Sequence, residues 1–181
     1  MNHIPVTIKF ETDLYSIKDW TILAVPRQQS AKLPSRGQIN IVGKINSHQF
    51  TTVLEPDGRL SHWMRINADM LRMIKAKAGD SVLVEMTINS DWPEPELPAD
   101  FASVLKVSPQ KVKQKWQDIT PMARWEWIRW INATSSQQTR AIRIEKTISK
   151  LNDKHQRPCC FNLAACTEPY VSKSAKLIEI N

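Results

Sequence analysis

The sequence predicts an α+β protein in which a small β-barrel containing one helix is followed by a helical domain. Up to Asn89 the chain contains six short apolar or alternating segments separated by turns, with one helical pattern among them. Because no helix follows each strand, a small barrel is favoured over a doubly wound sheet. From Pro98 onward, apolar residues recur at helical spacing instead.

The change of pattern falls across a proline-rich segment, Asp91–Pro98, which contains three prolines within six residues. Such a segment is typical of a stiff, extended linker. We therefore expect four parts in the chain. They are a β-barrel domain over residues 1–90, a linker over 91–98, a helical domain over 99–155 and a cysteine-containing tail over 156–181.

Six strands are expected in the barrel domain, and alternation or a continuous apolar run marks each one. Asn46–His48 separates two of them as a hairpin turn, with Gly43 as a candidate bulge. Asn67 is expected to cap the helix, and Gly79 to end it. The predicted strands cover residues 5–10, 20–25, 38–45, 49–54, 60–66 and 81–89.

Four helices are expected in the second domain, and the pair between Pro121 and Leu151 has the strongest helical pattern. Thr120-Pro121 is a typical helix start, because threonine caps free amides and proline has no N–H that needs a partner. The second helix of the pair is predicted to begin at Ser135, with Gln138 at capping-box spacing. Near the C-terminus, apolar residues over 175–180 favour a last strand or docking onto the barrel.

Arg140 falls within the apolar stripe of the last helix, where an unpaired guanidinium is costly. One interpretation is a structural partner, with Glu126, Asp118 or the ring of Trp130 as candidates. The other is an anion site that Arg140 shares with Arg143.

A surface for a partner is also predicted on the helical pair, where a tryptophan is flanked by guanidinium groups. The alternative is that these side chains only pack within the protein. The candidate binding residues are Arg124, Trp125, Arg129, Arg140 and Arg143.

The formal net charge is +7. Residues 1–97 carry 11 Lys/Arg and 11 Asp/Glu, whereas residues 98–181 carry 14 and 7. This division predicts that an anionic ligand or a protein partner binds through the helical half. No apolar run approaches the roughly 20 residues that a membrane-spanning helix needs, and the N-terminus lacks a secretory pattern. We expect a cytoplasmic protein without a transmembrane segment, and a homodimer remains open.

No sequence motif for catalysis, nucleotide binding or cofactor binding is present, so we expect no enzymatic activity and no cofactor. His62 is the best placed of the four histidines, and we expect it to be a partly exposed strand residue. The three cysteines are clustered in the tail with spacing that is poor for zinc, which predicts reduced thiols and no metal. They are Cys159, Cys160 and Cys166.

The residues that carry a family resemblance in the helical half are Trp116, Arg124–Trp130, Thr139-Arg140 and Arg143-Ile144. Through them, roughly residues 91–160 resemble the helical domain of the YdeI/OmpD-associated, or bacteriocin-protection, family. The preceding residues are similar to the domain of unknown function that commonly precedes these helices. The matching pieces are RGQINIVGKIN, QFTTVLEPDGR and KAGDSVLVEM. This resemblance implies a double-split β-barrel related to the barrels of AbrB-like regulators.

The resemblance implies a non-enzymatic binding and protection protein that acts in resistance to bacteriocins or antimicrobial peptides. Two alternatives remain open. One is an AbrB-like regulatory module that binds nucleic acid, which the neutral charge of residues 1–97 disfavours. The other is a barrel that binds a small ligand, with a pocket near Trp20, Trp63 and Trp92.

Overall fold

The structure is a computed structural model that describes residues 7–159 and 161–180. The chain divides into two compact units. The barrel unit contains the described residues up to Asp91 together with Leu163–Cys166 and the residues from Val171 onward. The helical unit contains Trp92–Asn162 and Thr167–Tyr170. The residues of the predicted linker from Trp92 onward therefore lie in the helical unit, and the tail is divided between both units.

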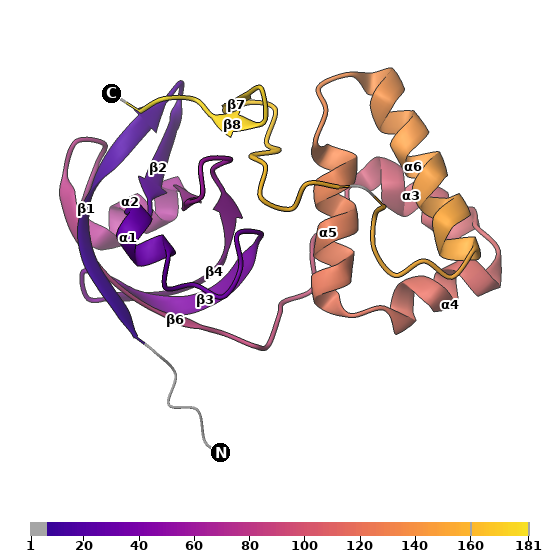
Figure 1. The fold of residues 1–181 in the computed structure, drawn as a ribbon, viewed down its shortest axis with the longest axis horizontal. Helices are drawn as coiled ribbons and strands as arrows, with labels where there is room; N and C mark the ends of the chain where they lie inside the picture. Colours follow the sequence, from indigo (N-terminus) through magenta and orange to yellow (C-terminus); the bar gives the residue numbers. More distant parts are fainter. Residues whose placement is uncertain (1–6, 160, 181) are drawn as a thin grey trace, which may run out of the picture. The chain divides into compact units, whose positions relative to one another are not determined.

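Six antiparallel strands form a closed barrel in the order β1-β2-β5-β4-β3-β6 (Figure 1). Two short helices, α1 (Arg27–Ser30) and α2 (Ala68–Ile74), accompany them. The predicted α+β class, a barrel followed by helices, is confirmed. The strands are β1 (Ile8–Ile17), β2 (Trp20–Ala24), β3 (Ile39–Ile45), β4 (His48–Pro56), β5 (His62–Ile66) and β6 (Ser81–Ile88).

Strand β1 is longer than the predicted strand over residues 5–10, of which Pro5 and Val6 lie outside the described residues. Its first part pairs with β6 from Ile8 to Asp13, and its second part pairs with β2 from Leu14 to Ile17. The polar residues in its middle end the apolar alternation, which is why the pattern predicted too short a strand. Backbone pairing continues there regardless of side-chain polarity.

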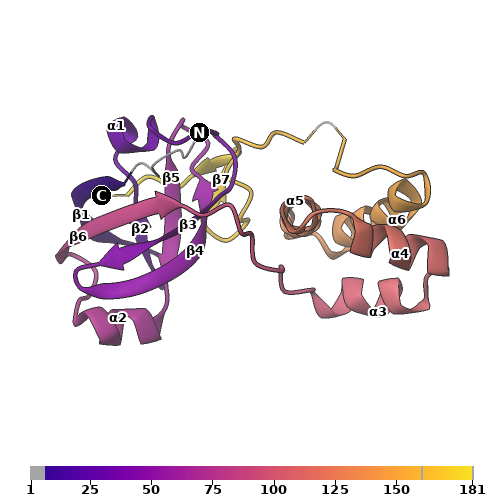
Figure 2. The ribbon, with the colours of Figure 1, turned by 90° about the horizontal axis from the view of Figure 1, so that it is seen from below.

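Alternate residues of the strands point inward and fill the barrel with apolar side chains. Met70 and Leu71 of α2 pack against this core. Figure 2 shows α1 and α2 on opposite sides of the barrel. The largest fully buried members of this core are Leu14, Leu23, Ile41, Ile45, Leu54 and Met86.

Asn46 and Ser47 form the predicted hairpin turn between the paired residues Ile45 and His48. Asn46 has a positive φ of 54°, and its side chain accepts a hydrogen bond from the Leu83 amide at 3.0 Å. Asparagine tolerates this conformation well. The predicted bulge at Gly43 is wrong, because Gly43 pairs regularly with Phe50 and Met86.

Asn67 caps α2 as predicted, since its side chain accepts from the Met70 amide at 2.8 Å. The helix ends earlier than expected. Lys75, with a left-handed φ of 53°, follows the last helical residue, whereas Gly79 (φ 93°) belongs to the next turn.

The C-terminal segment packs on the barrel unit, where Cys166, Val171 and Leu177 join a second apolar cluster with Trp63 and its neighbours on β1 and β2. It contains the two-residue strands β7 (Ser172–Lys173) and β8 (Lys176–Leu177). The Leu177 amide donates to the Asp57 carbonyl at 2.8 Å. The segment therefore docks on the barrel unit and also contains a short last strand, β8, so each of the two alternatives from the sequence holds in part.

The helical unit consists of α3 (Ala99–Val107), α4 (Gln110–Asp118), α5 (Pro121–Asn132) and α6 (Gln137–Asn152). Its core contains Phe101 and Trp116, whose ring centroids lie 5.1 Å apart in an edge-to-face arrangement. Thr120 caps α5 as predicted. The cap of α6 is Ser136, which accepts from the Thr139 amide, and not Ser135.

A substitution of Gly43 tests the close approach of β3 and β6 in the barrel. A Cβ atom at this position would lie 2.0 Å from the Glu85 carbonyl oxygen. We expect Gly43→Ala to lower the free energy of unfolding by about 1–3 kcal/mol, because the strands must separate to admit the methyl group. Gly37→Ala is the control, since its Cβ would first meet a side-chain atom, Leu163 Cβ, at 3.3 Å. Equal loss in both variants in urea denaturation would contradict this account.

Candidate binding site in the helical unit

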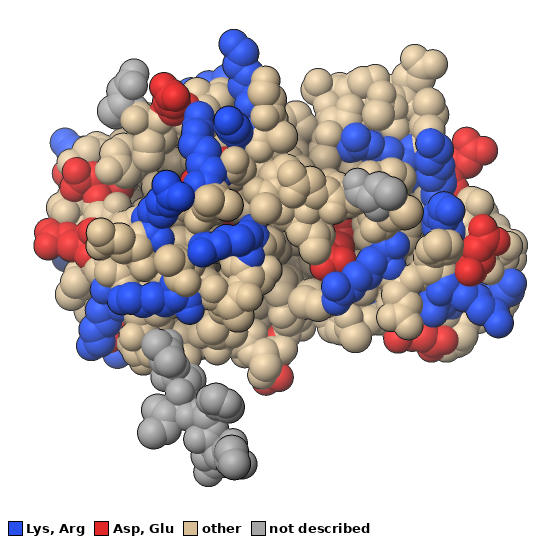
Figure 3. Space-filling view, viewed as in Figure 1, with Lys and Arg blue, Asp and Glu red and all other residues tan. Residues whose placement is uncertain are grey.

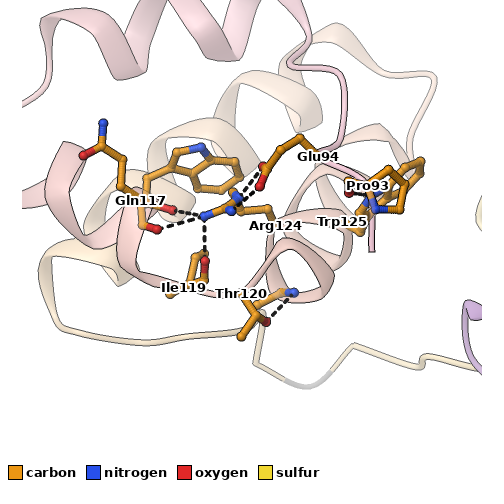
Figure 4. Close-up of polar contacts among 9 residues, drawn as sticks. Pro93, Glu94, Gln117, Ile119, Thr120, Arg124 and Trp125 are labelled. Carbon is orange, nitrogen blue, oxygen red and sulfur yellow. Dashed lines mark hydrogen bonds and ion pairs between the residues drawn. The ribbon is translucent and has the colours of Figure 1, made fainter. Parts of the chain in front are cut away.

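Arg124 is buried and binds the carboxyl end of α4 (Figure 4). Its Nη1 atom donates to the carbonyls of Trp116, Gln117 and Ile119 at 2.9, 3.0 and 2.6 Å. These groups have no partner within the helix, and a cation is favourable at a helix C-terminus. Nε and Nη2 form a bidentate pair with Glu94 at 2.8 and 2.5 Å. Arg124 thus connects the proline-rich segment, α4 and α5.

Trp125 lies on the adjacent side of α5 and packs against the same proline-rich segment. Its indole N–H donates to the Pro93 carbonyl at 2.7 Å (Figure 4). Its ring meets that of Trp92 edge to face, with centroids 6.5 Å apart. Because both its polar and apolar parts have intramolecular partners, the contacts favour packing as the role of Trp125.

Arg129 and Arg143 also have partners within the helical unit. Arg129 is buried, its Nε donates to Thr167 Oγ1 at 3.0 Å, and its guanidinium lies 5.1 Å from the centre of the Phe161 ring. Arg143 donates from Nη1 to the Trp130 carbonyl at 2.7 Å and stacks over the same residue's ring at 5.5 Å. Burial lowers the pKa of Arg143.

Arg140 forms a bidentate ion pair with Asp100, with Nε–Oδ2 and Nη2–Oδ1 distances of 2.5 and 2.9 Å. Its Nη1 also donates to Asn132 Oδ1 at 2.7 Å. The hydrogen bonds from Arg140 hold the pKa of Asp100 below its usual range. A structural partner therefore exists, as one interpretation of the sequence expected, but it is Asp100 of α3 rather than Glu126, Asp118 or the Trp130 ring.

The Asp100–Arg140 pair lies at the edge of an apolar groove bounded by α3, α4 and α6. The groove has a volume of about 700 Å³, within the range of ligand sites. Val112 and Ile144 are buried at its floor, and Val104, 38% exposed, lies on one wall. Its other lining residues are Pro109, Gln137, Ala141, Glu145, Ile148, Ser149 and Asn152.

The α6 residues that line this groove form one continuous stripe. They recur at spacings of three and four from Gln137 to Asn152, which places them on one face of the helix. At 1.5 Å per residue this stripe extends for about 22 Å. The sequence showed the apolar face of α6, but it did not show that α3 and α4 leave part of that face uncovered.

Trp20, Trp63 and Trp92, which the sequence suggested as pocket residues, do not line the groove. Trp63 is buried in the second apolar cluster of the barrel unit, where its indole N–H donates to the Pro56 carbonyl at 3.2 Å. Trp20 packs partly buried against that cluster, beneath the Arg65 guanidinium at 4.1 Å. Trp92, in the helical unit, contacts Trp125.

His62 is 1% exposed, so its expected partial exposure is wrong. Its Nδ1 lies 2.8 Å from the Ser30 hydroxyl, and its Nε2 lies 2.8 Å from the Gly37 carbonyl. Since a carbonyl only accepts, Nε2 carries a proton, and in the neutral imidazole Nδ1 accepts from the Ser30 hydroxyl. Ser30 is completely buried as well, so this arrangement fixes α1 against β5.

Of the cysteines, Cys159 is exposed, Cys166 is buried, and Cys160 lies outside the described residues. Among the described residues, no cluster of three or more His, Cys, Asp and Glu side chains has a geometry that could hold a metal ion. No described helix combines the length and the apolar composition needed to cross a bilayer.

The architecture defines a two-unit protein, a closed antiparallel barrel joined to a four-helix unit that carries an apolar groove. Residues 10–86 match the family model described as Domain of unknown function (DUF1905). Residues 94–154 match the model described as Bacteriocin-protection, YdeI or OmpD-Associated. The chain thus carries a DUF1905 domain followed by a domain of the YdeI/OmpD-associated bacteriocin-protection family. A comparison with curated proteins found no match.

Substitutions of Arg124, which donates hydrogen bonds to three carbonyls, test its structural role. We expect Arg124→Ala to lower the free energy of unfolding by about 3 kcal/mol or more, because buried carbonyls lose their donor. Arg124→Lys should restore only part of this stability, since an ammonium group cannot form the forked contacts. Chemical denaturation followed by tryptophan fluorescence measures both.

Glu94→Gln is the matched control for the Arg124 variants. The Glu94 side chain is 65% exposed, so losing its charge should cost less than about 1 kcal/mol. A loss in Glu94→Gln as large as that in Arg124→Ala would show that the ion pair, and not the carbonyl contacts, provides the stability.

Although Glu126 lies 3.5 Å from Arg157 Nε, its raised pKa predicts a pH dependence opposite in sign to that of an acid whose pKa is lowered on folding. Burial raises its pKa, although Arg157 and Arg129 oppose the shift. Ionisation of Glu126 therefore lowers the free energy of unfolding. This loss of stability is absent below about pH 4, where the carboxyl is protonated in both states, and it grows as the pH rises through the raised pKa. We expect Glu126→Gln to be stabilised relative to the wild type at pH 7 and to show no such gain at pH 4. Thermal denaturation at both pH values tests this, and a gain that does not depend on pH would contradict it.

Proposed function

We propose that this chain is a non-enzymatic binding protein of the YdeI/OmpD-associated type, which protects bacterial cells against bacteriocins or antimicrobial peptides. We further propose that a partner binds in the apolar groove bounded by α3, α4 and α6. The observation that carries the proposal is the groove itself, about 700 Å³ in volume, within the domain that matches the bacteriocin-protection family.

The contacts of the basic residues favour the groove over the guanidinium surface suggested by the sequence. Arg124, Trp125, Arg129 and Arg143 donate hydrogen bonds to backbone or side-chain atoms of the helical unit itself. A ligand that used these groups would have to replace contacts that hold the unit together. The groove, in contrast, exposes apolar side chains whose burial by a partner is favourable.

The barrel unit gives less support to the alternative functions. The described residues fill its interior with apolar side chains, unlike the open lumen of ligand-binding barrels. Ser30 and His62, a pair that resembles a nucleophile and its base, are 0% and 1% exposed, so almost no surface of either side chain is open to a substrate. Both observations favour a binding role over an enzymatic one.

The basic residues are also not concentrated in one unit. The barrel unit contains 13 of the 25 Lys and Arg residues and 10 of the 18 Asp and Glu residues, which leaves 12 and 8 in the helical unit. The net charges are thus +3 and +4, and Figure 3 shows Lys and Arg on both units. The charge difference between the two halves of the sequence therefore does not favour a nucleic-acid surface on the helical unit.

A groove-filling substitution tests the proposed function. We expect Ala141→Trp to abolish protection, because Ala141 is exposed in the groove and an indole there occupies the space of the partner. Ile142→Trp is the control, since Ile142 is 43% exposed on the same helix and does not line the groove. The measurement is survival of bacteria producing each full-length chain across a dilution series of a bacteriocin. No protection by the wild type, or equal protection by Ala141→Trp, would refute the proposal.

A further inference from the structure

The α6 stripe that lines the groove of the helical unit is long enough to lie along a second helix. This α6 lining runs over about four turns, with the apolar Ala141, Ile144 and Ile148 in the centre and polar residues at both ends. A helix that lies along such a stripe places residues at i, i+3, i+4 and i+7 against it. A compact small molecule would fill only part of a groove about 22 Å long.

The charges that line the groove indicate which kind of helix it accepts. Asp100, Arg140 and Glu145 are its charged lining residues. Asp100 and Arg140 neutralise each other through their bidentate pair. Glu145 is exposed, and no hydrogen bond or ion pair joins its carboxylate to a side chain of another described residue. The groove therefore presents one uncompensated carboxylate beside an apolar floor.

This local charge is opposite in sign to the net charge of the helical unit. At physiological ionic strength, charges more than about 8 Å apart at the surface are largely screened from each other. No described Lys lines the groove, and its one lining Arg, Arg140, is paired with Asp100, so Glu145 is the unpaired charge that a helix in the groove meets directly. The positive net charge of the helical unit by itself disfavours a basic partner. The carboxylate of Glu145 within the groove favours one locally.

We infer that the groove binds an amphipathic α-helix of about four turns, with an apolar stripe flanked by basic residues that pair with Glu145. This inference rests on the proposed function and specifies the partner of the same site. The central apolar residues of α6 supply the binding area, whereas Glu145 selects the sign of the partner's charge.

Three labelled 16-residue peptides test this inference in fluorescence anisotropy with the full chain. All three have the same leucine stripe, and the flanking residues are lysine, glutamine or glutamate. We expect the lysine peptide to bind about tenfold more tightly than the glutamate peptide, since one pair is attractive and the other repulsive. Glu145→Gln should weaken lysine-peptide binding about threefold and remove most of the discrimination.

Glu96→Gln is the control, because Glu96 is an exposed carboxylate of the same unit that does not line the groove. It should leave all three affinities unchanged. Ala141→Trp should abolish binding of every peptide, and circular dichroism confirms that each variant is folded.

Each other outcome has a definite meaning. Equal binding of the three peptides that Ala141→Trp abolishes would overturn the charge selection and leave the groove as the proposed binding site. Binding that persists in Ala141→Trp, or no binding to the wild type, would overturn the helix as occupant. The survival assay with bacteriocin does not depend on these peptides, so the proposed function is judged separately.

Discussion

The helical unit depends on one buried guanidinium, that of Arg124. Short helices such as α4, with nine residues, are unstable in isolation and leave carbonyl groups unsatisfied at their ends. Arg124 donates to three of these carbonyls and also holds Glu94 of the proline-rich segment. A single side chain thereby fixes the turn between α4 and α5 and the path of the chain that precedes α3.

These contacts give the proline-rich segment a structural role within the helical unit. Pro93 and Glu94 are both hydrogen-bonded to α5 residues, and Pro95 is buried. The segment is therefore part of the helical unit rather than a free spacer. Because Glu94 and Glu96 belong with the helices, and the lysines of the C-terminal segment belong with the barrel, the excess positive charge is shared between the units.

The groove shows how a small helical unit can provide a binding surface without specialised chemistry. Four helices enclose a core in which Phe101, Trp116 and Trp127 are buried, yet α3 and α4 cover only part of α6. The Asp100–Arg140 pair holds α3 and α6 together at one edge and satisfies its own charges. Binding energy in such a site comes from apolar area, and the remaining carboxylate provides selectivity.

The sequence by itself determined the fold class, the start of α5 at Thr120-Pro121 and the inward face of the strands that alternate, because these features depend on local periodicity and capping. It also carried the resemblance to the YdeI/OmpD-associated helices. Only the tertiary structure decided the partners of Arg140 and Arg124, the burial of His62 and the existence of the groove. These features depend on which distant residues meet. Asp100 lies 40 positions from Arg140, and no local pattern encodes that pairing.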